Sequence, residues 1–282
     1  MKRRGSAIPV TNPAKHTNTE KNMGFEGVTI EDLAGKAVLV TGASTGIGAA
    51  VARALGAQKA LVGVHYNSSE DAAKAVAADV ESAGGKAFLV RGDASKSGEM
   101  TRVVEETAAH FGKLDGLINN AGGMVARQKY EDWTDELYDS IMDLNARSVL
   151  AASKAAIPHI KKQGGGFIIN TTSIAARNGA GPGAGLYGSS KSIVANVTRG
   201  MAKELTGANI RVNAVAPGII DTPFHERYTT KAQMDAMIAT IPMGRAATSE
   251  ECVGAYLFLA STALAGYLTG QSIEVNGGQM ML

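Results

Sequence analysis

From residue 36 onward the chain alternates short apolar runs with long alanine-rich amphipathic segments. The apolar runs predict strands at 36–41, 60–65, 86–91, 114–119, 166–172, 209–215 and 272–276, and the segments between them predict helices near 46–57, 69–84, 97–112, 134–162, 186–206 and 249–260. Continuous apolar strands separated by helices are what a parallel sheet covered on both faces requires. The pattern therefore predicts one doubly wound α/β domain over residues 35–282.

The composition is that of an ordinary globular protein. With 282 residues, 45% of them hydrophobic and 19% charged, the chain can bury a large core. Cys252 is the single cysteine, so no intrachain disulfide can form and we expect a reducing, cytoplasmic location. The five histidines show no metal-ligand spacing, and we expect no metal site.

Residues 1–34 differ in charge from the remainder of the chain. We predict that they form a flexible extension, or an arm that docks on a neighbouring subunit. Within residues 1–25, five basic side chains against one acidic side chain give +4, so the remainder of the chain, at a total of +2, carries −2. This distribution does not favour nucleic-acid binding. The basic start has no apolar stretch after it, and no run of about 18 apolar residues follows, so we expect no membrane association. Removal of residues 1–30 is expected to preserve activity.

The first predicted strand ends in "TGASTGIG", residues 41–48. Gly42, Gly46 and Gly48 allow a tight turn and a close approach to a ligand, and the helix that follows presents free N–H groups to a pyrophosphate. The same letters match the G-x-S-x-G elbow of α/β-hydrolases, with Ser44 as nucleophile. Such an elbow lies inside its sheet after several strands, whereas this turn follows the first strand, so the dinucleotide interpretation is preferred.

"LYGSSK" places Tyr187 four residues before Lys191, and on a helix these positions share a face. A cation about 4 Å from a phenol, at an effective dielectric near 20, contributes about 4 kcal/mol and would bring the phenol pKa from about 10 towards 7. The pair therefore predicts a general acid and base that works near neutral pH.

Four further motifs fall where strands end or on the helix after the fourth strand: "INNAG" (118–122), "MDLNA" (142–146), "INTTS" (169–173) and "VAPGIIDT" (215–222). Together with the two motifs above, they resemble the short-chain dehydrogenase/reductase family, and most closely its 3-oxoacyl-acyl-carrier-protein reductases, over residues 35–282. The resemblance implies a Rossmann-like parallel sheet of seven strands in the order 3-2-1-4-5-6-7, a nicotinamide dinucleotide cofactor and a homotetramer.

By this resemblance Asn145, Ser173, Tyr187 and Lys191 match the catalytic residues of the family. Ser173 is preferred over Thr172 because it stands just beyond the apolar "FIIN". Ser173 would hydrogen-bond the substrate oxygen, Lys191 would also hold the nicotinamide ribose, and Asn145 would position a water. The implied cofactor-binding residues are Gly42, Ser44, Thr45, Gly46, Ile47, Gly48, Tyr66, Asn67, Ser68, Asp93, Ala94, Asn120, Ala121, Gly122, Tyr187, Lys191, Pro217, Gly218, Ile220 and Thr222.

The second strand is followed by no carboxylate before Glu70, and this favours NADP(H) over NAD(H), because an acid there would hold the ribose diol of NAD. Thr45 occupies a position where many NADP-dependent relatives have Arg or Lys. A phosphate would therefore rely on His65, Tyr66, Asn67 and Ser68.

The substrate is less constrained. The motifs "IPMGR" (241–245) and "YLTGQSIEVNGG" (267–278) resemble those of 3-oxoacyl-carrier-protein reductases. Similar motifs occur in related enzymes that oxidise sugars or other secondary alcohols. Met234, Met237 and Met243 would suit an acyl chain, and Lys154, Lys161 and Lys162 could meet an acidic carrier protein. We therefore expect reduction of a 3-oxoacyl thioester. The alternatives are a sugar, polyol or other secondary-alcohol dehydrogenase of the same family, a dinucleotide-binding sensor without catalytic activity, and an α/β-hydrolase that uses Ser44.

Overall fold

The computed structural model describes residues 28–281, apart from the side chains of residues 225 and 226. The strands are β1 (Ala37–Val40), β2 (Leu61–Tyr66), β3 (Lys86–Arg91), β4 (Gly116–Asn119), β5 (Gly166–Thr171), β6 (Ile210–Pro217) and β7 (Ser272–Val275). The α-helices are α1 (Gly46–Ala57), α2 (Glu70–Ser82), α3 (Ser97–Phe111), α4 (Asp135–Met142), α5 (Ser148–Lys162), α6 (Ala175–Asn178), α7 (Gly185–Leu205), α8 (Pro223–Tyr228), α9 (Lys231–Ile238), α10 (Glu250–Ala260) and α11 (Thr262–Ala265).

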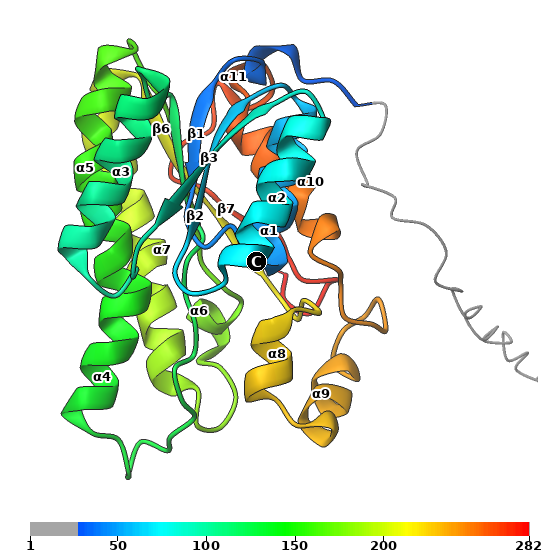
Figure 1. Ribbon diagram of the computed structural model, residues 1–282. Helices are drawn as coiled ribbons and strands as arrows, with labels where there is room; N and C mark the ends of the chain where they lie inside the picture. The colour runs from blue at the N-terminus through cyan, green and yellow to red at the C-terminus, as the bar shows by residue number, and fades with distance from the viewer. Residues whose placement is uncertain (1–27, 282) are drawn as a thin grey trace, which may run out of the picture.

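All seven strands form one parallel sheet in the order β3-β2-β1-β4-β5-β6-β7. The strand order reverses between β1 and β4, so the loops that follow these two strands separate at the carboxyl edge of the sheet. The predicted Rossmann-like α/β domain and its strand order are therefore confirmed. Figure 1 shows the sheet in the middle of the molecule with helices on both faces.

Each face of the sheet has its own apolar core. Helices α1, α2 and α10 pack on one face over Val38, Val40 and their neighbours, whereas α3, α5 and α7 pack on the other over Leu39 and Leu117. Consecutive residues of a strand point to opposite faces, which explains why Val38 and Leu39 belong to different cores. Figure 1 shows these two helical layers, with α8 and α9 near one end of the sheet.

Residues 28–34 pack against the domain, although the sequence placed them in the flexible extension. Leu33 is 1% exposed and belongs to the core formed by α1 and α10. The Asp32 carboxylate accepts hydrogen bonds from the Thr262 N–H at 2.7 Å and the Ala263 N–H at 3.0 Å, and so caps α11. The packed domain thus begins before residue 35, and the rest of the predicted extension, residues 1–27, lies outside the described residues.

The helix predicted over residues 134–162 is interrupted. A single π-helical turn, η2 (Asp143–Arg147), separates α4 from α5. Such turns are frequent at functional sites because they shift the helix by one residue and release backbone groups. The short helices α6, α8, α9 and α11 were not predicted.

Candidate active site

A cavity of about 860 Å³ runs along the carboxyl edge of the sheet. Its walls come from the segments that follow all seven strands, and Gln279 is the contribution of the segment after the edge strand β7. In an open parallel sheet this edge is where ligands bind. The cavity is lined by residues of both the glycine-rich turn and the helix that carries Tyr187.

The glycine-rich turn between β1 and α1 forms one end of the cavity. Gly42 has φ +64°, and a Cβ there would come within 2.9 Å of the Ala121 Cα. A Cβ on Gly48 would collide with the Gly42 carbonyl oxygen. The N-cap residue Thr45 makes no side-chain capping bond, and Ser44 to Ile47 line the cavity. Uncapped N–H groups at a helix start fit a pyrophosphate, so these residues fit a dinucleotide.

His65 and Asn120 hold this turn in place. The Gly42 N–H donates to His65 Nδ1 at 3.0 Å, and His65 Nε2 lies 2.9 Å from the Gly92 carbonyl oxygen. Burial lowers the pKa of His65, which favours the neutral ring that can accept from Gly42. Asn120 Nδ2 donates to the carbonyl oxygens of Thr41 and Gly42 at 3.0 and 3.1 Å. His65 was expected to contact a phosphate, but both ring nitrogens are already bonded.

Most of the predicted site residues line this one cavity, and three do not. Gly48 is buried under the turn, and the Tyr66 side chain is 9% exposed within the core formed by α1 and α2. Asn145 lies behind the cavity wall. The predicted site residues that line the cavity are Gly42, Ser44, Thr45, Gly46, Ile47, Asn67, Ser68, Asp93, Ala94, Asn120, Ala121, Gly122, Ser173, Tyr187, Lys191, Pro217, Gly218, Ile220 and Thr222.

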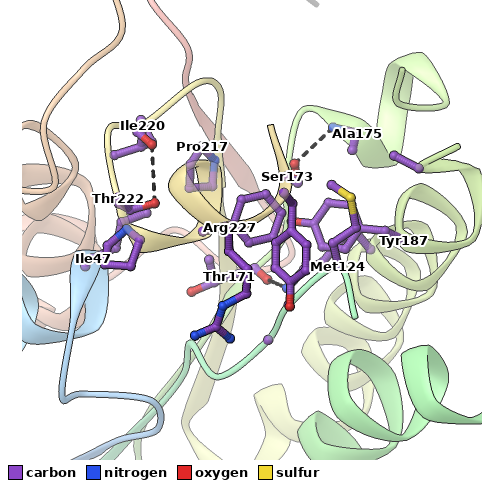
Figure 2. A pocket seen from close by; sticks show the side chains of 18 of the residues that line it. Ile47, Met124, Thr171, Ser173, Ala175, Tyr187, Pro217, Ile220, Thr222 and Arg227 are labelled. Atoms are coloured by element: carbon purple, nitrogen blue, oxygen red, sulfur yellow. Dashed lines mark hydrogen bonds between the residues drawn. The ribbon is translucent and has the colours of Figure 1, made fainter. Parts of the chain in front are cut away.

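Tyr187 and Ser173 meet in the middle of the cavity. The Ser173 hydroxyl is close enough to the Tyr187 phenol to influence its pKa, and it accepts a hydrogen bond from the Ala175 N–H at 3.1 Å. Figure 2 shows both residues in the pocket, with the bond between Ala175 and Ser173 drawn as a dashed line. The Thr172 hydroxyl instead donates to the Val215 carbonyl oxygen at 3.1 Å. Of the two hydroxyls considered, that of Ser173 is therefore the one beside the phenol.

Lys191 does not lower the pKa of Tyr187 in this structure, so that expectation was wrong. Burial raises the pKa of Tyr187 to about 12, and the Ser173 hydroxyl only partly opposes this. The Lys191 ammonium lies 5.9 Å from the centre of the phenol ring and donates to the Thr171 carbonyl oxygen at 2.9 Å. Burial also lowers the pKa of Lys191 to about 8. Desolvation of each group thus outweighs their mutual interaction.

Asn145 clamps the loop after β4 rather than lining the cavity. It lies in η2 and is fully buried. Its Oδ1 accepts from the Gly123 N–H at 3.0 Å, and its Nδ2 donates to the carbonyl oxygens of Gly123 and Ile141 at 2.8 and 2.9 Å. The side chain therefore fixes the backbone next to Gly122, which lines the cavity opposite Lys191.

The far end of the cavity contains residues that the sequence analysis missed. Met124 and Arg127 follow β4, and Phe224, Arg227 and Tyr228 lie on α8 after β6. The Phe224 ring is centred 5.6 Å from the Tyr187 ring. The rule that ligands bind beyond the carboxyl ends of strands could have directed attention to these segments. Neither segment, however, has a motif that marks individual residues.

The hydrolase interpretation requires a histidine near Ser44, and of the candidates downstream the described side chains of His110 and His159 both lie elsewhere. His110 stacks on Phe88 with ring centres 4.1 Å apart, and His159 Nε2 lies 2.9 Å from a Glu105 carboxylate oxygen. Both histidine side chains, on α3 and α5, thus already have other partners, and neither lines the cavity. Among the described residues no group of three or more His, Cys, Asp or Glu side chains is arranged to hold a metal ion.

Comparison with known proteins identifies relatives over nearly the whole domain. Residues 42–280 match a family model described as Enoyl-(Acyl carrier protein) reductase. The 3-oxoacyl-[acyl-carrier-protein] reductase of Synechocystis sp. is 38% identical over 253 residues, which are 88% of this chain and 98% of that protein.

Solved structures agree with the family match. The NADH-dependent reductase A1-R' responsible for alginate metabolism is 40% identical, with a TM-score of 0.82, covering 89% of this chain and 100% of that one. That reductase has also been solved with NAD. A short-chain dehydrogenase from Burkholderia cenocepacia in complex with NADP is 32% identical, with a TM-score of 0.82 and coverage of 88% and 99%.

Proposed function

Because the chain belongs to the short-chain dehydrogenase/reductase family and is an oxidoreductase of that family, we propose that it reduces a carbonyl group to a secondary alcohol with Tyr187 as the proton donor. A bound nicotinamide dinucleotide supplies the hydride for this chemistry. The residues of this chain hold the carbonyl oxygen, deliver the proton and exclude water.

The proposal rests on one observation: the neighbouring hydroxyls of Tyr187 and Ser173 line the same cavity as the glycine-rich turn. A carbonyl oxygen beside both hydroxyls can accept two hydrogen bonds, and these strengthen as negative charge develops on it. Tyr187 then transfers its proton to that oxygen. Lys191, fixed by the Thr171 carbonyl oxygen, lines the same cavity and would hold the nicotinamide ribose.

The pKa of Tyr187 favours the reductive direction. With a pKa of about 12 the phenol keeps its proton at neutral pH, as a general acid requires. The oxidative direction requires the phenolate. We therefore propose that the protein works as a reductase near neutral pH.

We propose a preference for NADP(H). The segment after β2, residues Asn67, Ser68 and Ser69, lines the cavity without a carboxylate. Asp93 is the one acidic residue among the described lining residues, and its Oδ1 already accepts from the N–H and the hydroxyl of Ser95 at 2.9 and 2.8 Å. The proposal rests on the absence of a ribose-binding acid. NAD(H) is the alternative, in line with the relative that has been solved with NAD.

The first substrate candidate is a 3-oxoacyl thioester on an acyl carrier protein. The names of curated relatives from Synechocystis sp. and Thermotoga maritima support it. The side chains offered for it in the sequence analysis support it less. Met237 lines the cavity, but Met243 is 67% exposed and neither Met243 nor Met234 lines it. Lys161 and Lys162 end α5 just before β5 begins, so they lie at the amino edge of the sheet, opposite the cavity.

The second candidate is a small polar carbonyl compound such as a keto-sugar. Besides apolar residues, the end of the cavity near α8 and α9 is lined by two arginines and by the amides of Asn178, Gln233 and Gln279. This polar lining suits hydroxyl and charged groups better than an alkyl chain. The reductase of alginate metabolism, at 40% identity, also supports it.

A substrate panel tests both candidates. We would follow the loss of NADPH and NADH absorbance with acetoacetyl thioesters, keto-sugars and cyclic ketones. Reduction of at least one class with NADPH preferred supports the proposal. Dinucleotide binding without any turnover would instead indicate a sensor, and cleavage of an ester without dinucleotide would indicate a hydrolase.

We also propose a homotetramer in the cytoplasm. Leu150 on α5 and Ile193 on α7 are 44% and 39% exposed, and β7 is an edge strand whose residues are only partly buried. These are surfaces through which further copies could pack. Light scattering at micromolar concentration should give four chains per particle, and a monomer would contradict the proposal. No helix in the part of the chain that the structure describes has the length and apolar character needed to cross a bilayer.

A further inference from the structure

Two guanidinium groups at the α8 end of the cavity have no acidic partner among the side chains that the structure describes, which do not include those of residues 225 and 226. Arg127 Nε donates to the Tyr228 carbonyl oxygen at 2.7 Å, and Arg127 Nη1 donates to the Pro182 carbonyl oxygen at 3.2 Å. Both acceptors are uncharged. Arg227, labelled in Figure 2, has its Cζ 5.9 Å from the centre of the Tyr228 ring and forms no ion pair with any acidic side chain that the structure describes. Two guanidinium groups thus line the cavity without a carboxylate partner among the described side chains.

The rest of the cavity lining does not supply the missing negative charge. The single acidic residue among the described lining residues, Asp93, follows β3 and lies on the cofactor side of the strand order, whereas Arg227 follows β6. Burial lowers the pKa of Arg127, and no carboxylate among the described side chains raises it. Arg127 is half-buried, whereas Arg227 lines the cavity but is exposed, so its guanidinium is accessible to a ligand. An accessible guanidinium can bind a ligand carboxylate through two parallel hydrogen bonds.

The position of Arg227 relates this charge to the reacting centre. Phe224 and Tyr228 are one turn apart on α8, with ring centres 5.4 Å apart, and the Phe224 ring lies 5.6 Å from the Tyr187 ring. Arg227 is three residues after Phe224 and therefore lies on an overlapping face of the helix. A small molecule whose carbonyl oxygen contacts Tyr187 can extend along this aromatic layer towards Arg227.

We propose that the substrate carries a carboxylate and that the Arg227 guanidinium binds it while Tyr187 protonates the carbonyl oxygen of the same molecule. Arg127 acts as a positioning residue, because its bonds to Tyr228 and Pro182 hold the end of α8 against the loop before α7. This inference rests on the proposed carbonyl reduction and narrows its substrate to keto acids, including keto-sugar acids.

The test compares each keto acid with its own primary amide, which has nearly the same shape and no charge. Levulinate and ketogluconate, each beside its amide, would be assayed with NADPH and NADH, and an acetoacetyl thioester would be included. We expect the carboxylates to be preferred by about tenfold or more in kcat/KM, the scale of one charge-assisted bidentate contact. The preference should lie in KM, because the contact is distant from the reacting atoms.

Variants then assign the preference to one side chain. Arg227→Gln should reduce the carboxylate-over-amide ratio by about tenfold, and Arg227→Lys should reduce it less, because the charge remains but the bidentate geometry is lost. Lys231→Gln is the matched control. Lys231 lies on the neighbouring α9, its side chain is 87% exposed and it pairs with Asp235, so the variant removes one positive charge nearby without touching the cavity.

The outcomes separate this inference from the proposed function. Equal use of acids and amides, or equal effects of Arg227→Gln and Lys231→Gln, would overturn the carboxylate site and leave the reductase standing. A clear preference for the acetoacetyl thioester, unaffected by Arg227→Gln, would do the same. If no carbonyl compound is turned over although the dinucleotide binds, the reductase proposal fails and this inference fails with it.

Discussion

Tyr187 and Lys191 lie one helical turn apart on α7, and burial shifts their pKa values in opposite directions. It raises the pKa of the phenol to about 12 and lowers the pKa of the ammonium to about 8. Both shifts favour the neutral form. Reduction uses the neutral phenol directly, whereas oxidation must first remove its proton.

Tyr187→Phe tests this role. The variant should fold and still bind the dinucleotide, because it loses one hydroxyl, but its turnover should fall by at least about a hundredfold, the usual scale of a lost general acid. In the wild type, the oxidation rate should rise with pH through the alkaline range while the reduction rate stays level near neutral pH. Steady-state rates in both directions measure this. Near-normal turnover of Tyr187→Phe would remove Tyr187 from its proposed role.

Lys191→Met tests the cost of burying an ammonium. The folded-state pKa of about 8 lies below the usual value of 10.5, so the unfolded chain binds this proton more tightly. The resulting cost is on the order of 3 kcal/mol at neutral pH and disappears as pH rises from about 8 to 10.5. Lys191→Met should therefore raise Tm by about 5 °C at neutral pH, after loss of the Thr171 hydrogen bond is included, while abolishing turnover.

Thermal unfolding followed at several pH values checks this. The stability gain of Lys191→Met should shrink as pH rises from about 8 towards 10.5. A variant that is less stable than wild type at neutral pH would show that the ammonium contributes more through its bonds than it costs through burial.

At the residue scale the sequence motifs predicted which side chains meet, but not their pKa values. The spacing of Tyr187 and Lys191 was sufficient to place them on one helix face. The direction of each pKa shift depended on burial by segments distant in sequence and on the Thr171 carbonyl oxygen, which no spacing reveals.

At the scale of elements, the long helices and the strands were predictable because each has an apolar face of regular period. Helix α9 has no buried residue and α8 is only six residues long, so neither leaves a periodic signal. The π-helical turn η2 was also missed, because an apolar pattern interrupted by one extra residue still resembles a single helix over 134–162. Unpredicted elements therefore form much of the substrate end of the cavity.

The segment after β2 provides a test of cofactor preference. Ser68 lines the cavity and is exposed, so a carboxylate there is tolerated and would meet the adenosine ribose. Ser68→Asp should raise KM for NADP by about tenfold or more through charge repulsion and improve the use of NAD. Ser68→Asn is the uncharged control. An unchanged ratio of kcat/KM for the two dinucleotides would show that the ribose pocket lies elsewhere.

At the scale of the whole molecule, residues 28–34 join the beginning of the described chain to α10 and α11. Besides the Leu33 and Asp32 contacts, the Ile30 N–H donates to Gln58 Oε1 at 2.6 Å. Removal of residues 1–34 should therefore lower the free energy of unfolding by about 3 kcal/mol, the scale of one buried leucine and one helix cap. Removal of residues 1–27 should leave it unchanged.

Denaturant unfolding of the two truncated chains measures the difference, with activity as a second readout. Equal stability of the two would show that Leu33 and Asp32 contribute little. The sequence placed the domain boundary at residue 35 because the first strand begins there, and a short segment that packs through one leucine and one aspartate has no periodicity to reveal it.

The strand order places the two ends of the cavity far apart, so that substitutions at one end do not affect binding at the other. Ser68 follows β2 and Arg227 follows β6, and the intervening β1, β4 and β5 separate them by four strand spacings, about 19 Å. Substitutions that far apart, with no shared partner, change binding free energies additively. Dinucleotide choice and substrate choice can therefore be altered one at a time, by evolution or by design, without either change undoing the other.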